Sequence, residues 1–221
     1  MTSLVSVAQV KDNVDAVMAR IDAVSGGRDI QLVAVTKAQP IELVTIAVEA
    51  GLFDLGENYA QELVSKSQAL DSVDPVPRWH FIGGLQRNKI KLIAPYVSLW
   101  HSIDRSRLLD EIAARAPQAR VLLQVNATGE ESKSGCQSAE VPQLIEHGRE
   151  LGLDVAGLMA VGPTDTSVDP RPTFSTVKEL ADQHGLTELS MGMSGDFEAA
   201  VSMGATIVRL GSVLFGSRPP R

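Results

Sequence analysis

The chain has a single cysteine, no excess of positive charge and no long apolar run, and each absence excludes a class of protein. Because Cys136 is the only cysteine in 221 residues, an internal disulfide is impossible, and a reducing cytoplasm is the expected compartment. The net charge of −7 and the pI of about 5.1 argue against non-specific binding to nucleic acid or to an anionic membrane. No apolar run is long enough to cross a bilayer, so no membrane partner is expected.

Two kinds of reactive site also lack support in the sequence. No set of His, Cys, Asp and Glu residues has the spacing of metal ligands, so no metal is expected. Cys136 has no histidine nearby in the sequence, which gives a cysteine nucleophile little support. The composition is 44% hydrophobic and 21% charged, which is ordinary for a globular protein with a sizeable core.

The first 25 residues predict an amphipathic helix that packs on the rest of the domain. Apolar residues recur there at spacings of three and four, namely Val7, Val10, Val14, Val17, Ile21 and Val24. Charged residues such as Lys11, Asp15 and Arg20 interrupt the segment, which therefore resembles neither a secretory signal nor a membrane span.

After this helix, strand-like and helix-like segments alternate along the chain. The eight predicted strands are Ile30–Thr36, Leu52–Gly56, Arg78–Ile82, Val97–Ile103, Arg120–Asn126, Leu153–Val161, Thr187–Met191 and Ile207–Phe215. Glycines fall where helices should end before the next strand, at Gly51, Gly152, Gly185 and Gly204. Strict alternation favours a parallel sheet with helical crossovers. We therefore predict a single (β/α)8 TIM-barrel domain over residues 1–221, with one extra N-terminal helix. A doubly wound open sheet is the alternative, since periodicity cannot distinguish a closed sheet from an open one.

Lys37 is the most informative residue, because it ends the apolar run Gln31–Lys37 just before a helix predicted to begin near Pro40. A lysine at the end of a buried strand can be desolvated, and desolvation lowers the pKa of an amine. A neutral amine can form a Schiff base with a carbonyl compound. The alternative is a strand-end lysine whose amine simply reaches water.

Other polar residues also collect where the predicted strands end, the edge at which barrels place their chemistry. They are Glu57, Asn58, His80, Ser102, Asp104, Asn126, Ser194, Arg209 and Ser212, and Met159 lies late in the sixth strand. Asp104 is expected to cap a helix, and Ser194 could do the same. Capping alone does not explain polar residues at most of the strand ends.

The segments Ser190–Asp196 and Arg209–Ser212 suggest an anion site at the last two strands. Their glycines allow close approach of the backbone, and the amides together with the Ser194 hydroxyl could bind a phosphate. A plain glycine-rich turn is an equally good interpretation. The basic residues of segment 87–91 are expected on a solvated helix face, and Lys133 is expected to be a surface lysine in a rim loop.

Five motifs together resemble the YggS/PROSC family of pyridoxal 5′-phosphate (PLP) homeostasis proteins. They are Val35–Lys37, Gly56–Asn58, Trp79–Lys89, Leu189–Ser194 and Arg209–Gly216, and the resemblance spans Leu32 to Gly216. It implies a fold like the alanine racemase barrel domain and PLP as the cofactor. The family usually has threonine where this chain has Ser212, a change that keeps the hydroxyl.

The resemblance also implies roles for single residues. Lys37 matches the lysine that forms a Schiff base with PLP. Ser194, Gly211 and Ser212 match the phosphate site, and Arg209 matches the arginine that faces the pyridine nitrogen. Asn58, His80 and Met159 match positions around the ring. An arginine at the pyridine nitrogen leaves that atom unprotonated, which makes the ring a poorer electron sink.

The function implied is cytoplasmic PLP homeostasis, in which a non-catalytic, monomeric protein buffers PLP or delivers it to apo-enzymes. Racemases of this fold carry a further β-domain with a catalytic tyrosine, whereas this sequence stops at Arg221 and has only Tyr59 and Tyr96. We therefore expect no catalytic residues. A small PLP-dependent racemase is the main alternative. A lyase in which Lys37 attacks a sugar phosphate is another, and it would be colourless.

Overall fold

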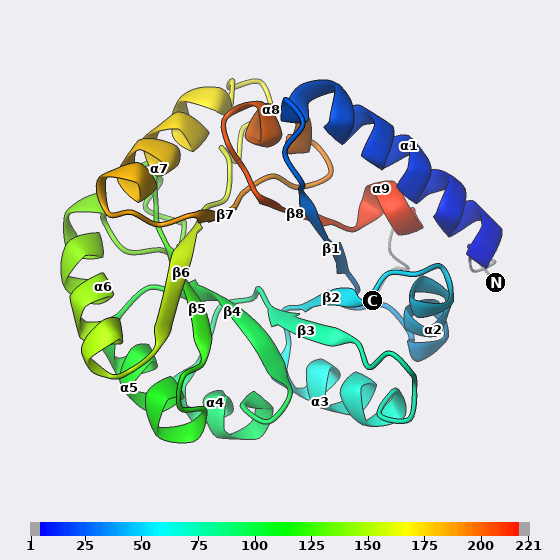
Figure 1. Ribbon diagram of the computed structural model, residues 1–221, viewed down its shortest axis with the longest axis horizontal. Helices are drawn as coiled ribbons and strands as arrows, with labels where there is room; N and C mark the ends of the chain where they lie inside the picture. Colours follow the sequence, from blue (N-terminus) through cyan, green and yellow to red (C-terminus); the bar gives the residue numbers. More distant parts are fainter. Residues whose placement is uncertain (1–4, 217–221) are drawn as a thin grey trace.

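The computed structural model describes residues 5–216, which form a closed barrel of parallel strands surrounded by helices (Figure 1). The strands are β1 (Gln31–Val35), β2 (Asp54–Glu57), β3 (Arg78–Phe81), β4 (Val97–Ile103), β5 (Arg120–Gln124), β6 (Asp154–Met159), β7 (Glu188–Ser190) and β8 (Ile207–Leu210). They follow one another around the barrel in sequence order, and β8 pairs with β1 from Gln31↔Ile207 to Ala34↔Leu210. The predicted barrel is therefore confirmed, and the open-sheet alternative is wrong.

The crossover helices cover the outside of the barrel, as expected from the alternation in the sequence (Figure 1). They are α2 (Ile41–Glu49), α3 (Ala60–Ala69), α4 (Arg87–Ile93), α5 (Ser106–Arg115), α6 (Val141–Glu150), α7 (Arg171–Gln183) and α8 (Phe197–Ser202), and a 3-10 turn, η1 (Ser138–Glu140), precedes α6. The predicted helix-ending glycines all have left-handed backbones, with φ from 64° at Gly185 to 101° at Gly204.

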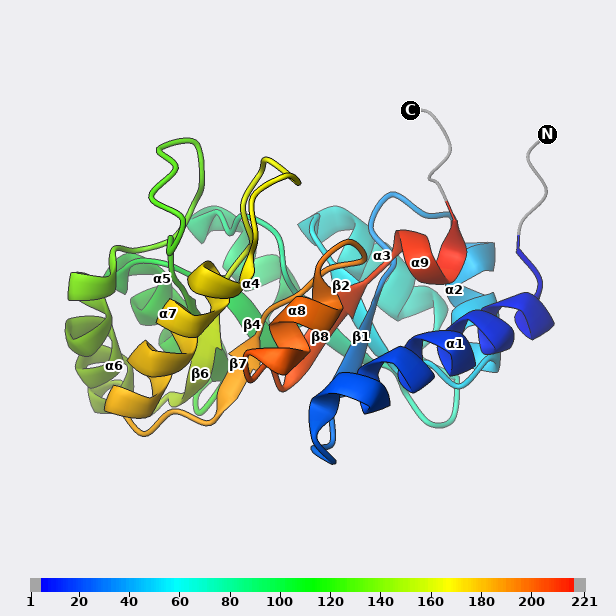
Figure 2. The same cartoon turned by 90° about the horizontal axis from the view of Figure 1, so that it is seen from above.

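The extra N-terminal helix is α1 (Val7–Ser25), which packs on α8 and on the short helix α9 (Ser212–Phe215) at the outside of the barrel (Figure 2). The Ser6 side chain caps it by accepting a hydrogen bond from the backbone amide of Gln9. Of the predicted apolar stripe, Val10, Val17 and Ile21 are buried. Residues 1–4 of the predicted helix lie outside the described part of the chain. Within residues 5–216, no helix is long and apolar enough to cross a membrane.

The prediction of a last strand over Ile207–Phe215 is wrong in its second half. β8 ends at Leu210, and Ser212–Phe215 forms the short helix α9 instead of more strand. The apolar residues Leu214 and Phe215 suit either structure, and both are buried. Asn13 of α1 stabilises the turn by donating a hydrogen bond to the carbonyl of Leu214 at 2.8 Å. Contact with α1, which is remote in sequence, therefore decides the structure of this segment.

The barrel interior contains both apolar and polar side chains. An apolar cluster is formed by Val33, Leu99, Leu122, Met159 and Ile207. The larger apolar cluster lies between the strands and the helices. Among the buried polar residues, His80, His101, Ser190 and Arg209 come from strands β3, β4, β7 and β8. Burying polar groups costs free energy unless they are hydrogen-bonded, so these residues need partners inside the barrel.

Candidate functional site

A cavity of about 420 Å³ opens at the carboxyl ends of the strands. Its lining includes Lys37, Asn58, Met159, Ser194, Arg209, Gly211 and Ser212, which are seven of the eight residues predicted to bind the cofactor. Apolar side chains, among them Val35, Ile82 and Val161, complete the walls. His80 is the one predicted residue that does not line this cavity.

Lys37 lies directly after β1, and hydrogen bonds fix the backbone on both sides of it. On one side, the carbonyl of Thr36 accepts a hydrogen bond from Lys66 Nζ at 2.8 Å. On the other side, the amide of Ala38 donates to Glu62 Oε2 at 2.8 Å, and Ala38 has a left-handed φ of 57°. A positive φ is unfavourable for alanine, so this backbone conformation is imposed by its surroundings.

The acidic partner of Lys66 is Glu57 at the end of β2, and the two side chains form a buried ion pair of 2.7 Å. Thr36 Oγ1 also donates to Glu57, at 2.6 Å. Burial raises the pKa of Glu57, although Lys66 opposes the shift. The sequence pattern indicates Glu57 as a polar residue at a strand end, but it indicates neither Lys66 nor Glu62. Their spacing of four residues on α3 was the available signal, but it is common on solvated helices.

Arg209 lies at the floor of the cavity and is only 4% exposed. Its Nη1 donates to the Ser190 carbonyl at 2.6 Å and to Ser190 Oγ at 2.7 Å, and its Nη2 donates to the Ala160 carbonyl at 2.9 Å. Burial lowers the pKa of Arg209 to about 10, so the guanidinium stays charged at neutral pH. A guanidinium has five N–H donors, so further donors remain for a ligand.

Ser194, Gly211 and Ser212 meet at one corner of the cavity. Ser194 Oγ accepts hydrogen bonds from the backbone amides of Gly211 at 3.3 Å and Val213 at 3.4 Å. Ser194 does not cap α8, because Asp196 holds the N-cap position there. A hydroxyl beside two backbone amides that form only long hydrogen bonds can bind a small anion.

The Asn58 side chain at the end of β2 offers a further polar contact. Within the described residues 5–216, its buried Oδ1 has no hydrogen-bond partner. A buried polar atom without a partner is costly. Because Asn58 lines the cavity, a ligand with a donor group would remove this cost. Met159, at the end of β6, adds an apolar contact nearby.

His80 lies inside the barrel below the cavity. Its Nδ1 is 2.9 Å from Nε2 of His101, and its Nε2 is 3.0 Å from Oδ1 of Asp54 at the start of β2. His101 Nδ1 is 2.8 Å from Ser190 Oγ. Ser190 begins the predicted anion-site segment Ser190–Asp196, whereas no prediction included His101, although a histidine within the apolar run Val97–Ile103 is a usable signal.

Two further sequence predictions need correction. Asp104 does not cap α5, whose N-cap residue is Arg105, and its carboxylate pairs instead with the Arg105 guanidinium at 2.5 Å. Lys133 is not a solvated surface lysine, since its side chain is only 14% exposed. Its Nζ pairs with Glu130 at 2.7 Å and donates to the carbonyl of Gly162.

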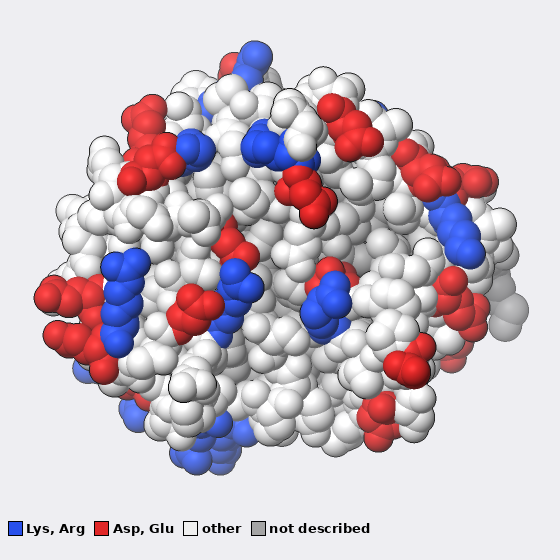
Figure 3. All heavy atoms as spheres, viewed as in Figure 1, with Lys and Arg blue, Asp and Glu red and all other residues white. Residues whose placement is uncertain are grey.

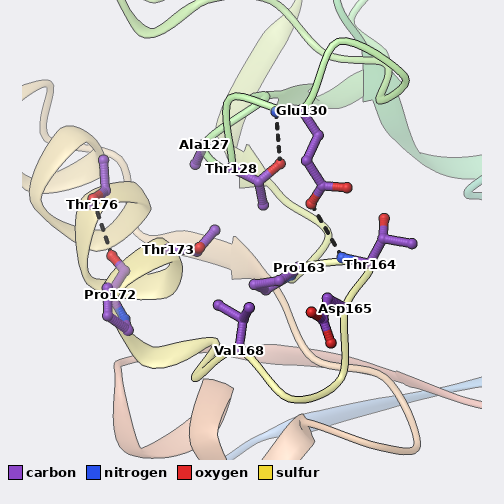
Figure 4. Close-up of a pocket in the computed structure, with 10 residues that line it drawn as sticks. All are labelled: Ala127, Thr128, Glu130, Pro163, Thr164, Asp165, Val168, Pro172, Thr173 and Thr176. Carbon is purple, nitrogen blue, oxygen red and sulfur yellow. Dashed lines mark hydrogen bonds between the residues drawn. The ribbon is translucent and has the colours of Figure 1, made fainter.

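A larger cleft, of about 660 Å³, is lined by residues other than Lys37 and lies between the loop after β5 and the segment after β6 (Figure 4). Glu130 and Thr128 line one wall, and Pro163, Thr164 and Val168 line the opposite one (Figure 4). Glu130 accepts a hydrogen bond from the Thr164 amide at 3.1 Å. Glu130 also forms an ion pair with Lys133 at 2.7 Å, so its charge is paired, and the described residues that line this cleft include no lysine.

Comparison with known proteins identifies the family. Residues 5–219 match the family described as alanine racemase, N-terminal domain. The pyridoxal phosphate homeostasis protein of Pseudomonas aeruginosa is 43% identical over 222 residues, covering 95% of this chain and 96% of the relative. The protein of the same name from Aquifex aeolicus is 42% identical over 200 residues, covering 85% and 87% of the two chains. The chain belongs to the pyridoxal phosphate homeostasis protein family. The resemblance predicted from the five motifs is thus confirmed.

Solved structures agree with this family. The structure of PipY from Synechococcus elongatus with PLP bound is 30% identical, has a TM-score of 0.77, and is matched over 94% of this chain and 100% of PipY. Alanine racemase from Corynebacterium glutamicum has a TM-score of 0.71 but only 16% identity, so that likeness concerns the fold alone. This chain spans 63% of that racemase, compared with nearly the full length of its homeostasis relatives.

Proposed function

We propose that this protein holds PLP as a Schiff base on Lys37 and acts in intracellular PLP homeostasis, storing the cofactor and delivering it without catalysing a reaction. Relatives named for PLP homeostasis and the PLP-bound structure of PipY support the cofactor. One observation carries the proposal to this chain. A single cavity combines a strand-end lysine, an anion-binding corner and a buried arginine.

The cavity fits the cofactor in size and in the chemistry of its lining. Its volume of about 420 Å³ lies within the range of pockets that bind small ligands. PLP supplies an aldehyde that condenses reversibly with amines and a ring that withdraws electrons. The unpartnered Asn58 Oδ1 and the long hydrogen bonds at Ser194 are polar groups that a ligand would satisfy.

Each lining residue is assigned a role in this proposal. The Lys37 amine forms the covalent bond. Ser194 and the backbone at Gly211 and Ser212 bind the phosphate, and Arg209 faces the pyridine nitrogen. Asn58 and Met159 contact the ring. His80 lies below the cavity, so we propose that it acts on the cofactor indirectly, through its neighbours in the barrel interior.

The absence of a second acid–base group in the cavity supports a non-catalytic role. Apart from Lys37 and Arg209, the described residues that line it carry no titratable side chain. Removal of a proton next to bound PLP and its return would need such a group. The relatives are also named as homeostasis proteins and not as enzymes.

The racemase alternative rests on the fold shared with alanine racemases. It predicts exchange of the α-proton of an amino acid when the loaded protein is incubated in heavy water. An exchange rate well above that of free PLP would support the alternative and would contradict storage of PLP without catalysis. We further propose one domain over residues 1–221, a monomeric state and a cytoplasmic location. Gel filtration tests the monomeric state, and cell fractionation tests the location.

The decisive experiment is the visible absorbance spectrum of the purified protein before and after borohydride, followed by peptide mass mapping. We expect a yellow protein, a band that borohydride bleaches, and a phosphopyridoxyl mass on Lys37. Lys37→Ala should lose the reducible bond and keep only loose binding through the phosphate, whereas Lys133→Ala should keep the label on Lys37. A label on another lysine, or a protein that stays colourless with added PLP, would contradict the proposal.

A further inference from the structure

A chain of side-chain hydrogen bonds crosses the barrel interior from Arg209 to Asp54. The successive distances are 2.7 Å from Arg209 Nη1 to Ser190 Oγ, 2.8 Å from Ser190 Oγ to His101 Nδ1, 2.9 Å from His101 Nε2 to His80 Nδ1, and 3.0 Å from His80 Nε2 to Asp54 Oδ1. His101 and Ser190 are fully buried. This series of hydrogen bonds starts at the cavity floor and ends at the opposite face of the barrel.

Asp54 lies at the start of β2, where the Arg78 guanidinium also binds its carboxylate through two hydrogen bonds of 2.7 Å. Burial opposes ionisation of this carboxyl, but the hydrogen bonds from His80 and Arg78 outweigh burial and lower its pKa. An ionised carboxylate can only accept hydrogen bonds. His80 must therefore donate to Asp54 from Nε2.

The direction of every other bond follows when both histidines are neutral. A neutral His80 that carries its proton on Nε2 accepts at Nδ1, so His101 must donate from Nε2. His101 then accepts at Nδ1 from the Ser190 hydroxyl. Because the Ser190 proton is used in this way, its oxygen lone pairs face Arg209. Burial lowers the pKa of His101 most, and the neighbouring His80 and Arg209 lower it further, which agrees with a neutral His101 ring.

We infer that Asp54, His80, His101 and Ser190 are positioning residues that fix the guanidinium of Arg209 at the cavity floor. The inference rests on the proposed function in one respect, namely that Arg209 faces the pyridine nitrogen. A barrel interior is usually filled by aliphatic side chains, and a polar chain inside it is costly unless every bond is made. When both histidines are neutral, each member of this hydrogen-bond chain donates and accepts in one order, which ends at the Asp54 carboxylate outside the cavity.

The first test needs no cofactor and measures the histidine tautomers by 15N NMR. Only four histidines occur in the chain, so assignment is feasible. We expect His80 and His101 to be neutral, each with its proton on Nε2. Asp54→Asn should remove this preference at both rings. Asp110→Asn is the matched control, because Asp110 pairs with the partly exposed His147 at 2.7 Å, and it should change His147 alone.

Three results of this NMR test would overturn the inference. The first is a wild-type His101 with its proton on Nδ1, and the second is a doubly protonated His80. Either result would reverse donor and acceptor in the hydrogen bond between the two histidines. The third is an unchanged His101 in Asp54→Asn. If Asp54→Asn does not fold, Ser190→Ala replaces it. We expect this variant to keep the His80 tautomer, which Asp54 sets, and to alter the Nδ1 shift of His101. An unaltered Nδ1 chemical shift would contradict the hydrogen bond between Ser190 and His101.

The second test measures the PLP complex. Ser190→Ala leaves Arg209 its bonds to the backbone carbonyls, so we expect PLP to remain bound. The loss of one ordering hydrogen bond should weaken binding about five- to tenfold and shift the visible band. Asp54→Asn should shift the band in the same direction, and Asp110→Asn should match the wild type. Changed tautomers with an unmoved band in both variants would rule out positioning. A wild type that binds no PLP would contradict the proposed function alone, because the NMR result is independent of it.

Discussion

At the scale of single residues, the buried Glu57 and Lys66 and the half-buried Glu62 form a cluster behind Lys37. It binds the carbonyl before Lys37 and the amide after it, so it fixes where the Lys37 side chain leaves the backbone. A buried ion pair contributes little net stability, because desolvation of the charges offsets their attraction. We infer that its value to this protein lies in orienting Lys37.

Removal of Lys66 should therefore greatly lower the free energy of unfolding. In Lys66→Ala, Glu57 stays buried without its partner, and we expect a loss of about 3–5 kcal/mol in the free energy of unfolding. Urea denaturation measures this loss. Lys178→Ala is the matched control, since Lys178 forms an exposed ion pair with Asp182, and it should cost no more than about 0.5 kcal/mol. A loss in Lys66→Ala as small as in the control would show that the pair is not buried in solution.

The same variant should show a distinct dependence on pH. Folding raises the pKa of Glu57, so the folded state holds this proton more tightly than the unfolded state, and stability falls as pH rises above about 4.3 towards the folded pKa. Without Lys66 the folded pKa rises further. The deficit of Lys66→Ala relative to wild type should thus grow between pH 5 and pH 7, and a constant deficit would contradict this account.

The sequence alone predicted some of the site residues and not others. Lys37 and Arg209 stood out because charged side chains in or beside apolar strands are unusual. Lys66 did not, because its spacing from Glu62 is ordinary for a solvated helix and its burial depends on β2 lying beneath α3. The position of His80 below the cavity also escaped prediction. The level of a side chain within a barrel depends on the stagger between strands, which a local motif does not contain.

At the scale of elements, the turn from β7 into α8 shapes the anion-binding corner. Gly192 has a φ of 93°, and a Cβ there would lie 2.9 Å from Cα of Phe197 at the start of α8. A side chain at this position would need both a strained backbone and a shifted helix. The turn therefore depends on glycine, whereas the sequence pattern alone left a phosphate site and a plain loop equally favoured.

Gly192→Ala tests the turn. We expect a loss of about 1–3 kcal/mol in the free energy of unfolding, together with weaker binding of PLP and of inorganic phosphate. Gly84→Ala is the control, because a Cβ at Gly84 meets no atom within 4 Å and its φ is not positive. Urea denaturation and phosphate competition provide the two readouts. Normal phosphate binding in a destabilised Gly192→Ala would separate the turn from the anion site.

Element ends were the least predictable part of the fold. The alternation of strands and helices identified all eight strands, including β2 and β7, which are short and have only one leucine each as an apolar side chain. The segment 212–215 was assigned to a strand because its apolar residues fit a buried strand as well as a buried helix turn. Its helical structure depends on Asn13 and α1, some 200 residues earlier in the chain, which no local pattern records.

At the scale of the whole molecule, the two ends of the barrel have different roles. The face seen in Figure 3 carries basic and acidic side chains interspersed, and ion pairs at the strand starts include Arg78–Asp54, Arg120–Asp154 and Arg120–Glu188. The opposite end carries the cavity and the long loops that follow β5 and β6 (Figure 2). In barrels of this kind the first end serves stability and the second serves function. The hydrogen bonds that run from Asp54 to Arg209 connect the two ends of the barrel.

Cofactor binding should stabilise the whole barrel, since the residues proposed to bind PLP come from β1, β2, β6, β7 and β8 and their following loops. At a free PLP concentration of 100 times Kd, the gain in unfolding free energy is about 2.7 kcal/mol, which corresponds to a rise in Tm of roughly 5–10 °C for a protein of this size. Lys37→Ala should retain only a small part of this rise, and inorganic phosphate should give a small rise of its own. Differential scanning calorimetry with and without PLP measures all three. An equal rise in wild type and Lys37→Ala would mean that the covalent bond contributes nothing to binding, and the anion corner would then have to carry the affinity.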